Sequence, residues 1–302
     1  MTAAGIVTYN PELELLKENL DALVKQCGHV AIVDNHSENI DQLEQLIQQY
    51  PQVILIKNKA NLGVATALNQ IVKQAGQDGF CWVLLLDQDS VIDDNLFAVY
   101  EQYIDLDRVA ILTPLIVDRT ELIAEQPAAP EQPEASDQPV SMEQPEPGEP
   151  FEYIRKGITS GSYIKIPICA QLGYFDEAMF IDYVDFEYCY RVRQAGYKIL
   201  QCNETRILHR LGAIEWVNVL GRRFEVTNHS AGRCYYVARN AEYCLLKHNR
   251  FLSRRNEYKK LIKKGLKIIL FEQNKSSKIS AMHRGIIDGR KLYRQETAAN
   301  QS

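Results

Sequence analysis

The sequence predicts an α/β protein with a mostly parallel central sheet flanked by helices and a helical C-terminal extension. Strand-like apolar runs and helical patterns alternate from residue 4 to residue 87, with short connections between them. Each run ends in polar residues. The fourth run, Phe80 to Leu86, is apolar throughout, as expected for a strand buried on both faces.

The elements alternate regularly along the first part of the chain. Proline begins the first helical pattern at Pro11, and a glycine turn at Gly63 opens the third. The expected elements are strands at 4–10, 29–35, 52–58 and 80–87 and helices at 11–27, 39–50 and 61–76.

Residues 121–150 interrupt this pattern. They contain eight acidic residues, no basic residue and seven of the eleven prolines. Such a composition buries too little apolar surface to offset the entropy of ordering, so we expect a disordered insert. Strand patterns resume at Phe151, and the expected organisation is therefore one domain at 1–248 and a helical extension at 249–302.

The composition excludes several classes of protein. The chain has 302 residues, 46% hydrophobic and 24% charged, which is typical of a globular protein. Its seven cysteines include no C-x-x-C pair, so neither a zinc site nor a disulfide framework is indicated. No signal-peptide or membrane-spanning pattern is present, and we expect a cytoplasmic protein without a nucleic-acid partner.

Two carboxylates follow the fourth strand directly. Asp87 and Asp89 would share one face of an extended chain, where two like charges repel unless a cation neutralises them. A divalent ion carrying substrate phosphates explains the pair, while an Asx turn that caps a loop is the simpler alternative. No G-x-G-x-x-G follows the first strand and no P-loop is present, which disfavours dinucleotide and P-loop sites.

Five stretches of the chain form an ordered set of motifs: AGIVTYNP (4–11), VDNHS (33–37), NKANLGVATALNQ (58–70), LLLDQDS (84–90) and MFIDYVDFEYCYRVRQAGYKI (179–199). Together they resemble the inverting GT-A glycosyltransferases of family 2, and specifically their rhamnosyltransferase branch. The fifth is the most specific, because this branch typically shows F-I-D-x-V-D-x-E followed by an arginine and A-G-Y. The likeness covers about residues 3 to 248 without the insert.

The resemblance implies a GT-A fold (Rossmann-like, of the nucleotide-diphospho-sugar transferase type) that binds a nucleotide-sugar donor, dTDP-β-L-rhamnose. Asp34 would bond the base, and Asp89 would bind Mg²⁺ or Mn²⁺ at the diphosphate. Thr8 and Asn10 would line the nucleoside pocket, Asn61 and Gly63 would lie near the base or ribose, and Asp87 would contact the ribose or sugar.

The resemblance also implies a general base in the second half. Inversion requires a base that deprotonates the acceptor hydroxyl, and the family's aspartate aligns with Asp185. Glu187 is expected to be structural, paired with Arg191 one turn on, and the role of Asp182 stays open. The alternative for Asp185 is a helix N-cap.

Three further residues complete the implied site. The family places a histidine near the metal or diphosphate, which makes His209 a candidate metal ligand, with an ordinary surface or core histidine as the alternative. Arg233 and Arg239 are candidates for binding diphosphate oxygens, with a solvated helix face as the alternative.

Other functions stay open at this point. The donor could be UDP- or GDP-linked. The strand followed by Asp87 and Asp89 also fits a haloacid-dehalogenase-type phosphatase, although that fold normally carries the motif on its first strand. A non-catalytic nucleotide-sugar-binding subunit is the third possibility, but it would need no base.

The C-terminal extension contains a basic run with apolar residues at helical spacing, RRNEYKKLIKKGLKIILF (254–271). Such a helix can dock on an anionic membrane surface, which suits a lipid-linked glycan acceptor of cell-surface polysaccharide at the inner face of the membrane. The alternative is a helix packed on its own domain or on a second subunit of an oligomer. Gly265 weakens the helix, which favours a preformed packing site.

Overall fold

The computed structural model describes residues 2–119, 149–209, 215–219 and 222–299. Apart from Glu149 and Pro150, the predicted insert lies outside the described residues. The chain forms two compact units. The first contains the described residues of 2–180 and 184–209, and the second contains 181–183 and those from 215 to 299.

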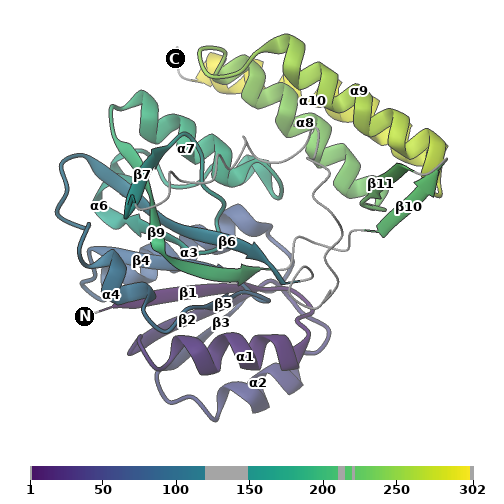
Figure 1. Ribbon diagram of the computed structural model, residues 1–302. Helices are drawn as coiled ribbons and strands as arrows, with labels where there is room; N and C mark the ends of the chain where they lie inside the picture. The colour runs from purple at the N-terminus through teal and green to yellow at the C-terminus, as the bar shows by residue number, and fades with distance from the viewer. Residues whose placement is uncertain (1, 120–148, 210–214, 220–221, 300–302) are drawn as a thin grey trace. The chain divides into compact units, whose positions relative to one another are not determined.

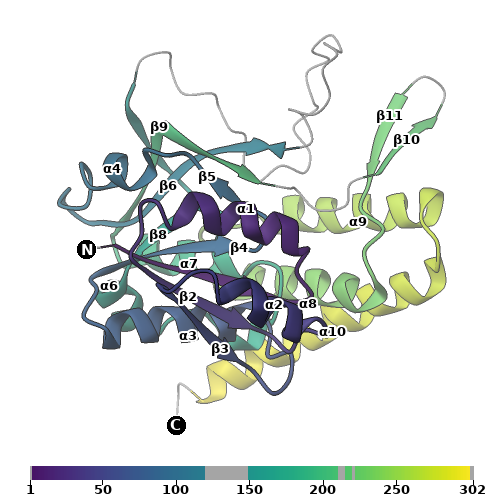
Figure 2. The same cartoon turned by 90° about the horizontal axis from the view of Figure 1, so that it is seen from below.

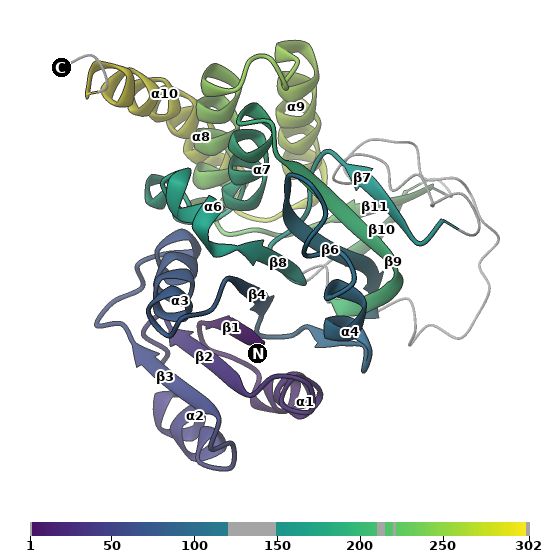
Figure 3. The same ribbon diagram turned by 90° about the vertical axis from the view of Figure 1, so that its left-hand side faces the viewer.

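The first four strands of the first unit are parallel, as predicted, in the spatial order β3-β2-β1-β4 (Figure 1). Helices α1 and α2 cover one face of these strands and α3 covers the other (Figure 3). The elements are β1 (Ala3–Thr8), α1 (Leu13–Leu23), β2 (His29–Asp34), α2 (Ile40–Ile47), β3 (Val53–Lys57), α3 (Val64–Gln77) and β4 (Trp82–Asp87).

Helix α1 begins later than the sequence suggests. Its first helical residue is Leu13, whereas the helical pattern begins at Pro11. Pro11 belongs to the preceding loop, where its carbonyl accepts a hydrogen bond of 2.9 Å from the Asn39 side chain.

The strand order creates a topological switch point. The chain runs outward from β1 to β3, and β4 then returns to the other side of β1. In open α/β sheets, ligands bind beyond the carboxyl ends of the strands at such a point. The register pairs Thr8 with Asp34 and Val7 with Asp87, so these predicted site residues end at one edge of the sheet.

The rest of the first unit makes the sheet mixed. Strand β8 runs antiparallel to both of its neighbours, β4 and β6, while β9 is parallel to β6. Within the described residues the sheet has nine strands. The further elements are β5 (Val91–Ile92), α4 (Leu96–Tyr100), β6 (Val109–Asp118), β7 (Phe151–Ile154), β8 (Ser162–Lys165), α6 (Ile166–Gln171), the 3₁₀ helix η1 (Glu177–Met179), α7 (Val184–Gln194) and β9 (Lys198–His209).

The core of the first unit forms where amphipathic helices cover alternate strand residues. Leu16 and Leu20 of α1 are fully buried together with Ile6 and Ile32 of the strands. On the opposite face, Gly5 allows α3 to approach closely, because a side chain there would collide with Ile71. The sheet is thereby buried on both faces, as the continuous apolar strands predict.

Among the residues that the structure describes, the second unit has three helices and a hairpin. The hairpin pairs β10 (Glu215–Val219) with β11 (Arg222–Val226), and the helices are α8 (Ala231–Lys247), α9 (Arg254–Phe271) and α10 (Lys275–Ala299) (Figure 2). The domain boundary expected at residue 248 falls between α8 and α9 of this unit. None of the described helices combines the length and apolar character that crossing a bilayer requires.

Two glycines set the packing of α10 on α8. A Cβ atom at Gly285 would collide with the carbonyl oxygen of Tyr235, and one at Gly289 with the carbonyl oxygen of Arg239. The glycines are one helical turn apart, so they open a continuous strip along which the two backbones approach. Gly265 of α9 is different, because a Cβ there would lie 3.7 Å from Ile279, an ordinary contact.

We expect Gly289→Ala to destabilise the protein by about 1–3 kcal/mol, because α10 must move away from α8. The matched change Gly265→Ala should instead stabilise it by up to about 1 kcal/mol, since alanine is the better helix former. Denaturant titration of both variants measures the two effects. Equal stabilities would show that α8 and α10 separate without cost.

Candidate active site

The carboxylate of Asp34 is held rigidly at the end of β2. Its Oδ1 accepts hydrogen bonds from Thr8 Oγ1 at 2.9 Å and Ser37 Oγ at 2.5 Å, and its Oδ2 accepts one from Ser37 N at 2.9 Å. Asp34 is 1% exposed and Thr8 is fully buried. Buried polar groups require such partners, and the bonds fix the end of β2 against the end of β1.

Asn10 lies in the loop after β1 in a left-handed backbone conformation, with φ 48°. Its N–H donates to Ser37 Oγ at 2.8 Å, and its Oδ1 accepts from Glu38 N at 2.7 Å. Ser37 therefore joins Asn10 to Asp34, a linking role that sequence reasoning missed. The motif VDNHS contains this serine, but nothing in its local pattern shows what it bonds.

Gly63 is the N-cap of α3, and only glycine fits at this position. Its φ is 86°, and a Cβ would lie 2.6 Å from the carbonyl oxygen of Phe180. Its N–H donates to Asn61 Oδ1 at 3.0 Å, and Val64 N donates to that same Phe180 oxygen at 2.6 Å. The structure thus places the start of α3 beside the stretch that leads toward α7.

The structure brings Asp87, Asp89 and His209 together, although His209 is remote in sequence. Asp87 Oδ2 lies 3.9 Å from His209 Nε2, and Asp89 Oδ1 lies 3.6 Å from His209 Nδ1. Ser90 Oγ lies 2.8 Å from His209 Nδ1 and 2.6 Å from Ser160 Oγ. The buried serines therefore orient the imidazole between the two carboxylates, with Nε2 on the Asp87 side.

Sequence reasoning missed both serines. Ser90 and Ser160 are fully buried, and Ser160 Oγ also accepts a hydrogen bond from Asp87 N at 3.1 Å. The small residues around Ser160 have a packing role, because a Cβ at Gly161 would lie 2.7 Å from Pro114. Nothing in the local sequence around Ser160 shows which neighbours it has, and only the fold does.

Asp185 is the second residue of α7, so it is not the N-cap that the alternative interpretation proposed. Its side chain is half-buried in the first turn, where the helix dipole stabilises a carboxylate, and its Oδ1 accepts from Phe186 N at 2.8 Å.

Burial raises the pKa of Cys189, one turn along, to about 12. That thiol stays protonated at neutral pH and is excluded as a nucleophile.

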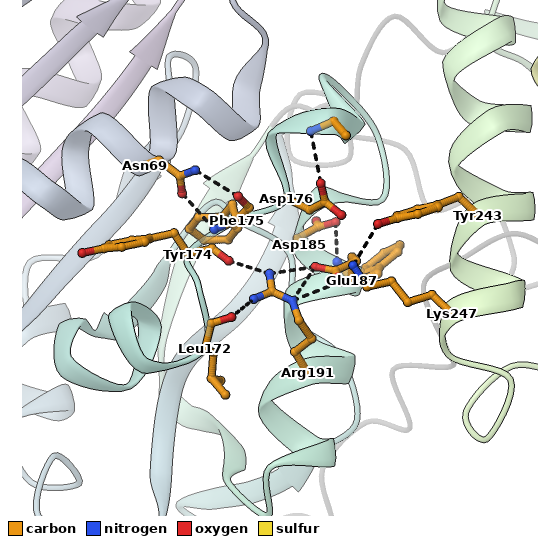
Figure 4. A network of polar contacts seen from close by, with 12 residues as sticks. Asn69, Leu172, Tyr174, Phe175, Asp176, Asp185, Glu187, Arg191, Tyr243 and Lys247 are labelled. Carbon is orange, nitrogen blue, oxygen red and sulfur yellow. Dashed lines mark hydrogen bonds and ion pairs between the residues drawn. The ribbon is translucent and has the colours of Figure 1, made fainter. Parts of the chain in front are cut away.

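Glu187 and Arg191 form the predicted ion pair one turn apart (Figure 4). Glu187 is fully buried, and its two carboxylate oxygens accept from Arg191 Nε at 2.9 and 2.8 Å. The guanidinium also donates to the carbonyls of Leu172 at 2.5 Å and Tyr174 at 2.6 Å. The pair therefore anchors α7 to the loop after α6.

Asp182 belongs to the second unit, in the short stretch 181–183 that immediately precedes α7. Asp182 and Tyr183 have positive φ values of 63° and 66°, which side-chain-bearing residues adopt at a cost. The buried Asn240 of α8 supports this backbone by donating to the carbonyls of Ile181 and Asp182, both at 2.8 Å. The strained stretch is thus held from α8.

The two candidate arginines have partners within the second unit. Arg233 Nη2 lies 3.0 Å from Asp182 Oδ1, and its Nε donates to Oδ2 at 3.2 Å. The guanidinium of Arg239 lies 4.7 Å from the ring centre of Tyr236, and its Nε donates to Asn240 Oδ1 at 2.9 Å. Arg233 is 43% exposed, so the solvated helix face that was the alternative still describes it, whereas Arg239 is partly buried.

The residues around Asp89 suit a divalent ion that is shared with a substrate. In the part of the chain that the structure describes, no group of three or more His, Cys, Asp and Glu side chains is arranged to hold a metal. Carboxylates are the preferred ligands of Mg²⁺ and Mn²⁺, and Mg²⁺ is commonly bound by one or two of them together with substrate phosphates. Asp87 and Asp89, partly exposed beside His209, provide such an incomplete set.

We expect Arg191→Met to destabilise the protein by about 3–5 kcal/mol, because it leaves the Glu187 charge buried without its partner. Lys17→Met is the matched control. Lys17 pairs with Asp21 at the same one-turn spacing, but both side chains are nearly half exposed. Its loss should cost less than about 1 kcal/mol. Similar denaturation midpoints for the two variants would contradict a structural role for the buried pair.

Comparisons with known proteins agree with this architecture. The family model described as "Glycosyl transferase family 2" matches residues 4–147. The chain is similar to "dTDP-rhamnosyl transferase RfbF" of Shigella flexneri, with 29% identity over 247 residues that cover 82% of this chain and 80% of that protein.

Two solved structures share the fold. S. aureus TarS 1-349 in complex with UDP-GlcNAc has a TM-score of 0.51 at 16% identity, covering 94% of this chain and 80% of that chain. GalNAc-T7 with UDP, GalNAc and Mn²⁺ has a TM-score of 0.55 at 16% identity, covering 80% of this chain but only 50% of that chain. Identity this low shows the fold alone, and that fold is the predicted GT-A type. Together, the family match over residues 4–147, the relative and the fold show that the chain is similar to glycosyl transferase family 2, and they support a glycosyltransferase.

Proposed function

We propose that the protein transfers L-rhamnose, with inversion, from dTDP-β-L-rhamnose to a hydroxyl group of a glycan acceptor. The alignment with a protein named as a dTDP-rhamnosyl transferase, across four-fifths of both chains, supports the donor. The observation that carries the chemistry is the meeting of Asp87, Asp89 and His209 beyond β4, at the switch point of the sheet.

The nucleoside would bind at the ends of β1 and β2. Thr8 and Ser37 hold the Asp34 carboxylate in one orientation, and a carboxylate has acceptor capacity beyond the three bonds it receives here. Asp34 would accept from the base, with Asn10 beside the nucleoside. Asn61 and Gly63 would lie near the base or ribose, where the absence of a Cβ at Gly63 keeps the backbone close.

Asp89 would hold Mg²⁺ or Mn²⁺ at the donor diphosphate. His209 would be a further ligand through Nε2, the ring nitrogen that does not contact Ser90. The ion would stabilise the charge that develops on the leaving dTDP. Asp87 would contact the ribose or sugar. The bonds from Ser160 to the Asp87 backbone and from Ser90 to His209 would keep these groups in place without reorganisation during the reaction.

Asp185 would act as the general base. Inversion requires the acceptor oxygen to attack the anomeric carbon opposite the leaving diphosphate, and Asp185 Oδ would take the proton of the acceptor hydroxyl. The anchoring of α7 by Glu187 and Arg191 fixes the helix turn that carries this carboxylate. Glu187 itself is fully buried and neutralised by Arg191, so its role is to support α7.

Arg233 and Arg239 would help to bind the donor diphosphate. Asp182 holds the Arg233 guanidinium with two aligned contacts, and phosphate oxygens present the same bidentate pattern. Donor binding at Arg233 would therefore exchange one anionic partner for another and release Asp182. Arg239, stacked on Tyr236, would supply a second cation whose orientation is already fixed.

The acceptor that suits this reaction is a lipid-linked glycan of cell-surface polysaccharide. A cytoplasmic enzyme working at the inner face of the cell membrane would meet both this acceptor and the dTDP-linked donor.

We expect the purified protein to release dTDP slowly from dTDP-rhamnose when Mn²⁺ is present, and to release no inorganic phosphate. Asp89→Asn and EDTA should each abolish this release and the metal-dependent binding of the donor, because the diphosphate loses its bridge to the protein. Asp94→Asn is the matched control, since Asp94 is an exposed carboxylate five residues away. Release of phosphate, or full activity of Asp89→Asn, would contradict the assignment.

We expect Asp185→Asn to lower the rate of sugar transfer roughly a hundredfold or more, the usual contribution of a general base. The dissociation constant for dTDP-rhamnose, measured by calorimetry, should not change, because asparagine keeps the shape of the side chain. Asp182→Asn is the comparison variant. If Asp185→Asn keeps wild-type turnover while Asp182→Asn loses it, the base is Asp182.

A further inference from the structure

Helix α9 presents a row of large apolar side chains to the solvent. Ile262, Leu266, Ile269 and Leu270 are 62%, 53%, 50% and 63% exposed. Their spacing of four, three and one residues puts them on one face of the helix. Scattered exposed apolar residues are ordinary, but a contiguous row of four marks an interaction surface.

The opposite face of α9 already has its own packing partners. Leu261 and Ile268 are buried in the core of the second unit, with Cys234, Ala238 and Ala241 of α8 and Met282 of α10. Glu257 is 3% exposed and accepts from Tyr183 at 3.1 Å and from Lys260 at 2.9 Å. Folding of the second unit therefore accounts for only one of the two apolar faces.

The exposed face is also cationic. Arg255 and Lys259 are exposed and precede Ile262 in the same series of four- and three-residue steps, so the row is basic in its first half and apolar in its second. The helix sequence RRNEYKKLIKKGLKIILF contains seven lysines and arginines and one carboxylate, the buried Glu257. No acidic side chain of α9 is therefore exposed to balance these charges.

We propose that this outer face of α9, made of Arg255, Lys259, Ile262, Leu266, Ile269 and Leu270, docks on the surface of an anionic lipid bilayer. The four aliphatic side chains would enter the boundary between headgroups and acyl chains, and the basic side chains would contact lipid phosphates. Apolar and cationic groups on one helix face match such a surface in both respects.

A second copy of the chain fits this face less well. Two α9 helices in contact through this face would place Arg255 and Lys259 of both copies in one interface, and neither helix has an exposed carboxylate to pair with them. Like charges at short range oppose such an association.

The helix is also already formed, which answers the objection that Gly265 raises. Leu261 and Ile268 hold α9 on the second unit, so membrane binding does not need to fold the helix. A rigid, preformed face loses less conformational entropy on binding than a segment that folds at the interface.

The test is co-sedimentation of the full-length protein with vesicles. We expect binding to phosphatidylcholine vesicles that contain phosphatidylglycerol, and much less binding to phosphatidylcholine alone. Binding to the anionic vesicles should weaken as salt is raised, because salt screens exposed charges over a Debye length of about 10 Å. Leu266→Gln/Leu270→Gln should lower binding at least tenfold. Arg255→Gln/Lys259→Gln should lower it for anionic vesicles in particular.

The matched control is Ile54→Thr/Ile287→Gln, which replaces two other exposed apolar residues, one on β3 and one on α10. It should bind vesicles like the wild type. All variants should keep the wild-type melting temperature and release dTDP at the wild-type rate, so failure of membrane docking is separate from failure of the proposed transferase activity.

Three results would overturn the proposal. The first is an absence of binding to anionic vesicles at low salt. The second is binding that the α9 variants do not change. The third is a dimer, measured by sedimentation velocity, that Leu266→Gln/Leu270→Gln dissociates while vesicle binding is absent, because a second copy would then be the occupant of this face.

Discussion

The return of β4 to the side of β1 is the constraint on which the site depends. If the chain had continued outward from β3, Asp87 and Asp89 would lie at the far edge of the sheet, with β2 and β3 between them and β1. Instead the register pairs Val7 with Asp87 and Thr8 with Asp34, so residues from three strand ends meet at one edge. The face of the sheet that each helix covers follows from this strand order, because α3 must cross to the other face before β4 can enter beside β1.

Buried hydrogen bonds turn this edge into a positioned set of groups. Thr8 and Ser37 hold Asp34, while Ser90 and Ser160 hold His209 and the Asp87 backbone. Each bond satisfies a polar group that would be costly to bury alone, so stability and positioning arise from the same contacts. The Glu187–Arg191 pair has the corresponding function for α7, where it joins a helix to loop carbonyls.

In the second unit, the two faces of helix α9 have different environments. One face of α9 packs through Leu261 and Ile268, whereas the other exposes apolar and basic residues that packing does not require. The glycines of α10 serve packing alone, because their lack of a side chain lets the backbones of α10 and α8 approach each other. Folding therefore explains the sequence of α10 and the inner half of α9, and leaves the outer face of α9 to another partner.

The sequence by itself determined the local elements, since strand and helix periods and the polar strand ends are properties of neighbouring residues. It also determined the Asp87–Asp89 pair, the Glu187–Arg191 pair and the family resemblance, which rest on short spacings and ordered motifs. Only the tertiary structure decided that β8 is antiparallel, that Ser90 and Ser160 orient a histidine more than a hundred residues after Ser90, and that Asp182 pairs with Arg233. Such contacts depend on strand order and helix packing, which bring together residues whose separation along the chain carries no periodic signal. For the same reason, the apolar spacing of α9 showed an amphipathic helix, but only its packing showed which apolar residues are buried and which remain exposed.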